Sequence, residues 1–136
     1  SDDWINQRLK AIDARKEFTD ELKYKGIESS KDFASLTNLL TKVWSGFSVK
    51  EYKEYKGLTK ENLRDNMSNM ELVLNMLAEV SSTEISKTKN DTGYSSAESS
   101  VIKGSNIAKT AKEQIEKETG KKVVTSKKHI NTMQLK

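Results

Sequence analysis

The chain has 136 residues, of which 34% are hydrophobic and 32% are charged, and its formal net charge is +4. This length is typical of one domain with one core. The chain has no cysteine, which excludes disulfides and thiolate metal sites, and no apolar run approaches the roughly 20 residues that a transmembrane helix needs. We therefore expect a single domain (residues 1–136) in a reducing compartment, the cytoplasm.

The basic residues are concentrated at the C-terminal end. Nine lysines and three glutamates follow Ser100, a local charge of +6, so the first hundred residues carry −2. The first residues contain acids and lack the apolar core of a signal peptide, and the chain begins with serine instead of methionine. We expect it to be the C-terminal part of a longer protein, with a basic tail at about residues 121–136 that attracts acidic partners.

The absence of proline and the helical spacing of the apolar residues predict an all-α fold, a single compact bundle of about five to seven helices with short turns. The first helix is expected from Asp3 to Lys25, with Gly26 as its stop. Its predicted core face consists of Trp4, Ile5, Leu9, Ile12, Phe18 and Leu22.

The second helix is expected to begin at a cap formed by Ser29 or Ser30 and to end at Gly46, with Trp44 packed at its end. Its predicted core residues are Phe33, Leu36, Leu39, Leu40 and Val43.

Two Ser-x-x-Glu pairs have the spacing of a capping box, in which the serine side chain and the glutamate side chain each bind the other's backbone N–H. Ser48 with Glu51 predicts a short helix that ends at Gly57, and Thr59 with Asn62 predicts a further helical turn. Ser68 with Glu71 opens the most apolar helix, which we place at the centre of the bundle. Its predicted buried stripe is Met70, Val73, Leu74, Leu77 and Val80, with Leu72 and Met76 off the stripe.

Polar residues and glycine dominate residues 88–100, which predicts a mobile, Ser-rich loop. In the helix that follows, three small residues lie between two branched ones on one face, so that a second helix can approach closely. This face consists of Val101, Gly104, Ala108, Ala111 and Ile115. After Gly120 we expect a short extended piece at Val123 and Val124, and a last basic turn around Ile130 and Met133 that Ser126 caps.

The sequence shows no grouping of catalytic residues. His129 is the single histidine and has no acid beside it, so we expect a surface residue and not a base or a metal ligand. The glycines do not form a phosphate-binding loop. We therefore expect no catalytic residue, no cofactor and no metal, and a domain that is not an enzyme.

Lysines and tyrosines are mixed from Lys50 to Lys56, with Lys60 and Arg64 following, as on surfaces that bind single-stranded nucleic acid. Tyr52 and Tyr55 share one helical face, however, and the simpler interpretation is that both pack on the core while the lysines stay in water.

The segment Lys56–Met67 (KGLTKENLRDNM) is the longest of several separated segments that resemble a known family. These segments resemble the DNA-damage-inducible protein D family and the C-terminal region of prophage antirepressors that carry a Bro-N domain, and the resemblance extends from about Trp4 to Ile130. The other matching segments are Lys31–Ala34, Met70–Leu72, Asn106–Ala108, Ile115–Glu116 and Thr119–Val124. The resemblance implies a bacterial or prophage protein of the DNA-damage response, acting on recombinase filaments that form on single-stranded DNA.

Three functions are therefore considered. The first is a non-catalytic interaction module with a protein partner from the DNA-repair or phage-regulatory machinery. The second is direct binding of single-stranded or duplex DNA by the basic C-terminal region, and the third is dimerisation through the face that contains Gly104. The candidate contact residues are Lys53, Lys56, Lys60, Arg64, Lys109, Lys112, Lys121, Lys122, Lys127 and Lys128.

Overall fold

The computed structural model describes residues 2–128, without the side chain of Trp4. The helices in this part of the chain are α1 (Asp2–Tyr24), α2 (Ser30–Ser45), α3 (Val49–Tyr55), the 3-10 turn η1 (Arg64–Asn66), α4 (Asn69–Lys87) and α5 (Tyr94–Thr119). Residues 2–128 contain no strand. The predicted all-α bundle is confirmed.

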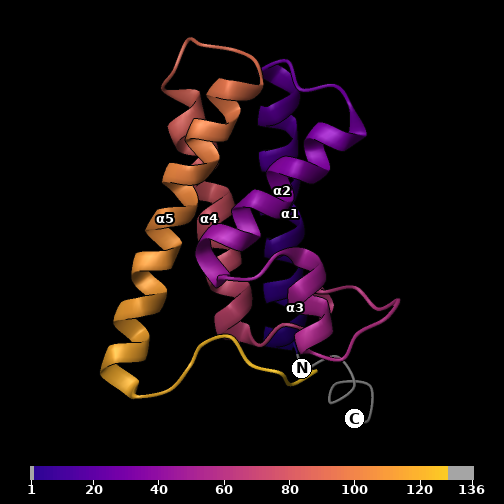
Figure 1. Cartoon of the computed structure of the whole chain (residues 1–136), viewed down its shortest axis with the longest axis vertical. Coiled ribbons are helices and arrows are strands. Elements are labelled where there is room, and N and C mark those ends of the chain that lie inside the picture. The colour runs from indigo at the N-terminus through magenta and orange to yellow at the C-terminus, as the bar shows by residue number, and fades with distance from the viewer. Residues whose placement is uncertain (1, 129–136) are drawn as a thin grey trace.

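Helix α4 lies at the centre of the bundle, where α1, α2 and α5 all contact it (Figure 1). Helices α4 and α5 form an antiparallel hairpin. Helix α1 runs parallel to α4, as two hydrogen bonds show. Near the start of both helices Arg8 donates to the carbonyl of Met67 (2.8 Å), and near their ends Lys25 donates to the carbonyl of Ser86 (2.6 Å). The predicted central place of α4 is confirmed.

The helix starts follow the predicted capping chemistry. Ser29, and not Ser30, caps α2 through its side chain. Both capping boxes are formed, by Ser48 with Glu51 at α3 and by Ser68 with Glu71 at α4. At the other end of α2, Gly46 has a φ of 87°, which glycine adopts without strain.

The predicted turn after α3 begins later than expected. The 3-10 turn η1 begins at Arg64, and the side-chain oxygen of Asn62, two residues earlier, accepts a hydrogen bond from the backbone N–H of Asp65 (3.1 Å). The backbone N–H of Thr59 instead donates to Glu61 (2.9 Å). The predicted pairing of Thr59 with Asn62 was therefore wrong.

The predicted core face of α1 was wrong in its first half. Phe18 and Leu22 are buried as expected, together with Ala11 and Ala14. The exposed residues are Ile5, Leu9 and Ile12, and Ile12 is 60% exposed. The rotation has a physical cause: Arg15 turns toward α4, where it meets a buried carboxylate, and the small alanines beside it let the two helices approach.

The predicted stripe of α4 was also wrong, since most of it faces outward. Met70, Val73 and Val80 are exposed, Val73 by 45%, whereas Leu72, predicted off the stripe, is buried. The buried face of α4 is rich in polar residues: Glu71, Asn75, Glu79, Ser82, Thr83 and Ser86. Each of the first three binds a side chain from another part of the chain, and these partners decide which face is inside.

The Ser-rich loop is shorter than predicted. Residues 94–100 form the first two turns of α5, and Ser100 is buried. Tertiary contacts override the loop composition here: the N–H of Gly93 donates to the carbonyl of Lys25 (2.7 Å), and the hydroxyl of Tyr94 contacts that of Ser35 (2.7 Å).

The predicted close-packing face of α5 is confirmed, and it packs within the chain. Val101, Gly104 and Ala108 are buried against α4, and a Cβ at Gly104 would lie 2.3 Å from the backbone nitrogen of Ser82. We call this contact the Gly104 seam. Helix α4 fills this seam at Gly104 within the chain.

Candidate functional site

Two adjoining hollows form one cleft between α1, α2, α3 and α4. The inner hollow has a volume of about 480 Å³ and the outer one about 990 Å³. Both are lined by Arg15, Thr37, Val49 and Lys53, which join them into a single cleft. A volume of this order suits a ligand or a peptide segment.

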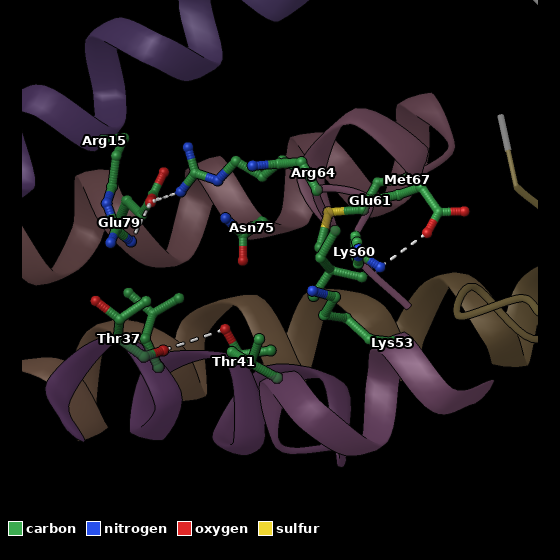
Figure 2. A pocket seen from close by; sticks show the side chains of 14 residues that line it. Arg15, Thr37, Thr41, Lys53, Lys60, Glu61, Arg64, Met67, Asn75 and Glu79 are labelled. Carbon is green, nitrogen blue, oxygen red and sulfur yellow. Dashed lines mark hydrogen bonds and ion pairs between the residues drawn. The ribbon is translucent and has the colours of Figure 1, made fainter. Parts of the chain in front are cut away.

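A buried carboxylate lies at the inner end of the cleft. Arg64 donates a hydrogen bond to Glu79, and Arg15 approaches the same carboxylate oxygen to 3.7 Å. In Figure 2 the two arginines reach Glu79 from different sides, and Thr37 and Thr41 of α2 lie across from it. Burial raises the pKa of Glu79 although both arginines act to lower it. Two guanidinium groups thus share one carboxylate, which leaves positive charge at this end.

Asn75 supplies a neutral donor on the same wall. It is one helical turn before Glu79 on α4 and is buried, and its side-chain oxygen accepts a hydrogen bond from the indole N–H of Trp44 (3.0 Å). This bond orients the amide group. Since Asn75 lines the inner hollow, its NH₂ group can serve as a donor to a bound anion.

The outer half of the cleft combines apolar and basic side chains. Phe33, Ala34, Val49 and Leu58 form the apolar part. Lys31, Lys50 and Lys53 also line this half, and none of the three forms an ion pair with a residue in the described part of the chain. Glu54 is the acid that accompanies them. The outer half therefore offers both hydrophobic contact and uncompensated positive charge.

The two tyrosines of α3 behave differently. Tyr52 is buried against Trp44, as predicted, and burial together with the neighbouring Glu71 raises the pKa of its hydroxyl. Tyr55 is half exposed and stacks on Phe47, with the ring centroids 5.1 Å apart. The prediction that both pack on the core holds for Tyr52 only.

The structure brings three of the ten predicted contact residues together, since Lys53, Lys60 and Arg64 all line the inner hollow. Lys109 and Lys112 lie on α5 and do not line the cleft. The remaining predicted lysines are Lys56 and those that follow α5: Lys121, Lys122, Lys127 and Lys128.

The prediction of Lys56 as a contact residue was wrong. Its side chain is inside the protein, with 2% of the residue exposed, and its ammonium group lies 2.9 Å from Glu71. The same group donates hydrogen bonds to the backbone carbonyls of Thr125 (2.7 Å) and Lys127 (2.8 Å). Glu71 also accepts a hydrogen bond from the hydroxyl of Tyr52. We call Lys56 and Glu71 the buried pair.

The buried pair fixes the segment that follows α5, residues 120–128, which we call the strap. Figure 1 shows this yellow segment running back from the end of α5 beneath α4 toward α3. Val123 and Val124 form an irregular stretch with both side chains buried, where a short extended piece was predicted. His129 and the last basic turn around Ile130 and Met133 lie outside the described residues.

Reasoning from the sequence missed Arg15, Asn75 and Glu79. A signal was present, because Glu71, Asn75 and Glu79 recur every four residues in an otherwise apolar helix, and side chains at this spacing share one face. Such a polar row indicates either a solvated face or a buried face with partners, and the sequence alone does not separate the two.

Comparisons with family models, with curated proteins and with solved structures gave no match. The family resemblance therefore rests on the matching sequence segments alone.

None of the helices in the described part of the chain combines the length and hydropathy that crossing a bilayer requires. Within residues 2–128, no cluster of three or more acids or histidines is placed to hold a metal ion.

Proposed function

We propose that the domain is a non-catalytic interaction module of the bacterial or prophage DNA-damage response, whose cleft holds an acidic segment of a partner protein. One observation supports this proposal: lysines that form no ion pair within residues 2–128 lie together with apolar side chains in the lining of the outer half of the cleft. An acidic amphipathic peptide can make two kinds of favourable contact with such a surface. Its apolar side chains become buried, and its carboxylates lie beside the lysines. The link to DNA damage comes from the resemblance in Lys56–Met67.

The test is binding to recombinase filaments assembled on single-stranded DNA, measured by co-sedimentation. We expect the double variant Lys31→Glu/Lys53→Glu to bind at least tenfold more weakly than the unaltered protein. The matched control is Lys10→Glu/Lys23→Glu, which makes the same charge change on α1 at exposed positions that do not line the cleft. Equal binding by the two double variants would contradict the proposal.

Direct binding of nucleic acid by the basic C-terminal region is the second candidate function. The strap favours it, because four lysines fall within eight residues there. Binding to naked DNA that weakens steeply with salt is the expected result. The Gly104 seam gives no support to dimerisation, since α4 of the same chain packs against α5 there.

A further inference from the structure

The strap is held in place by a buried charge, and not by regular secondary structure. Its carbonyls at Thr125 and Lys127 both accept hydrogen bonds from the ammonium group of Lys56. The N–H of Thr125 approaches a carboxylate oxygen of Glu71 to 3.4 Å. Upstream, the N–H of Val123 donates to the side chain of Glu116 (3.0 Å). Four contacts therefore fix the path of the backbone over five residues.

This path separates the side chains of the strap into two groups. Val123 and Val124 point inward and are buried. The lysines at 121, 122 and 127 are exposed and form no ion pair with any residue of the described chain, while Lys128 lies 3.8 Å from Glu61. Since Glu61 also lines the inner hollow, the strap adjoins the mouth of the cleft.

The chemistry of the strap differs from that of the cleft. Its outer surface presents lysines and Ser126, and its two apolar side chains are turned away. A protein partner gains little from such a surface, because exposed ion pairs contribute only about 0–1 kcal/mol each. Phosphate groups, in contrast, are bound by lysines and hydroxyls through charge and counterion release, without apolar contact.

We propose that the strap binds the sugar–phosphate backbone of single-stranded DNA, and that Lys56 and Glu71 are positioning residues that hold its lysines in register for this contact. The proposal rests on the second candidate function. A single strand is flexible and can follow an irregular segment, whereas a duplex is stiff over far longer distances than the strap.

The experiment is fluorescence anisotropy with a labelled oligodeoxythymidylate, over a series of salt concentrations. For single strands, each neutralised phosphate contributes about 0.7 to the slope of log K against log salt. Removing two charges with Lys127→Gln/Lys128→Gln should therefore reduce the slope by about 1.4. Lys56→Met keeps all strap lysines but releases the strap, and we expect about the same reduction from it.

The combination of these changes separates a positioning role from a general loss of stability. When Lys56 is already replaced, Lys127→Gln/Lys128→Gln should cause little further loss, because the strap lysines no longer act together. Lys25→Met is the matched control. Lys25 is also buried and also donates to two carbonyls, those of Ser86 and Lys89, but at the other end of α4. This control should bind like the unaltered protein.

Lysine acetylation of the unaltered protein, read by mass spectrometry, keeps the proposal testable if Lys56→Met fails to fold. In the free protein Lys56 should react far more slowly than the exposed Lys103, and the oligonucleotide should protect the strap lysines but not Lys103. Reaction of Lys56 as fast as Lys103 would overturn the proposal.

The possible failures are distinguishable. If the unaltered protein shows no salt-sensitive binding to the oligonucleotide, the second candidate function itself is wrong. If the strap charges matter but Lys56→Met binds with unchanged slope, the function stands and the positioning role is refuted. Equal competition by poly-L-glutamate or by duplex DNA of equal charge would refute the assignment to single-stranded DNA.

Discussion

Replacing Gly104 by alanine tests the Gly104 seam. The new Cβ would lie 2.3 Å from both the backbone nitrogen and the hydroxyl of Ser82, and 2.6 Å from its Cα. Because two of these atoms belong to the backbone, rotation of the Ser82 side chain cannot relieve the contact, and α4 and α5 must move apart. Overpacking of this kind costs about 1–3 kcal/mol, with backbone contacts at the upper end.

Helix propensity acts in the opposite direction, since alanine is favoured over glycine by about 1 kcal/mol inside a helix. We therefore expect Gly104→Ala to lower the free energy of unfolding by about 1–2 kcal/mol, equivalent to a fall in Tm of several degrees. Urea unfolding followed by circular dichroism measures the change. The matched control is Asn106→Ala, at an exposed position of the same helix, which should be slightly stabilising. A rise in Tm for both variants would refute close contact at the seam.

Three further predictions concern the helices. Leu74→Ala should cost about 2–5 kcal/mol in the free energy of unfolding because its side chain is buried, whereas Val73→Ala on the exposed face should change it by about 0.5 kcal/mol or less, as urea unfolding can show. Ser68→Ala removes the side-chain cap of α4 and should cost about 1 kcal/mol by the same assay. At α3, the hydrogen bond from the N–H of Ser48, and then the contact with Lys42, hold the pKa of Glu51 at about 2. Because the folded-state pKa is depressed, the stabilisation is present above the ordinary pKa of 4.5 and is lost as pH falls through about 2. A carboxyl titration of Glu51 by NMR with a midpoint near 4.5 would contradict this.

The parts of the fold that depend on neighbouring residues could be predicted from the sequence. Such parts are the capping boxes, the serine cap of α2 and the glycines that end helices. Each involves residues within a few positions of one another, so its spacing can be read directly from the sequence. Small residues at helical spacing on α5 likewise indicated a close helix contact before the partner helix was known.

The orientation of α4 could not be predicted in this way. Apolar periodicity selected the face of Met70 and Val73, but the polar face is inside because Lys56, Trp44 and Arg64 come from other segments to meet it. Burial of a polar side chain is favourable where it finds a hydrogen-bonding or charged partner, and the position of that partner depends on the whole fold.

The same limit explains the assignment of Lys56. In the sequence it is one of several lysines between Lys50 and Arg64, with nothing to distinguish it from Lys53. The carbonyls that bind its ammonium group belong to Thr125 and Lys127, about seventy positions later in the chain. Local sequence spacing does not reveal this contact. The cleft residues Arg15 and Glu79 come together by the same kind of long-range contact.

The polar interior of α4 has a thermodynamic consequence. Unfolding raises the heat capacity in proportion to the apolar surface it exposes and lowers it in proportion to the polar surface. An ordinary domain of this length would show a change of roughly 1.6–2.0 kcal/mol/K. Here the central helix buries carboxylates, an amide and hydroxyls, while Met70, Val73 and Val80 are already partly exposed to water before unfolding begins. Scanning calorimetry should therefore yield a smaller value, and the stability of the domain should vary unusually little with temperature.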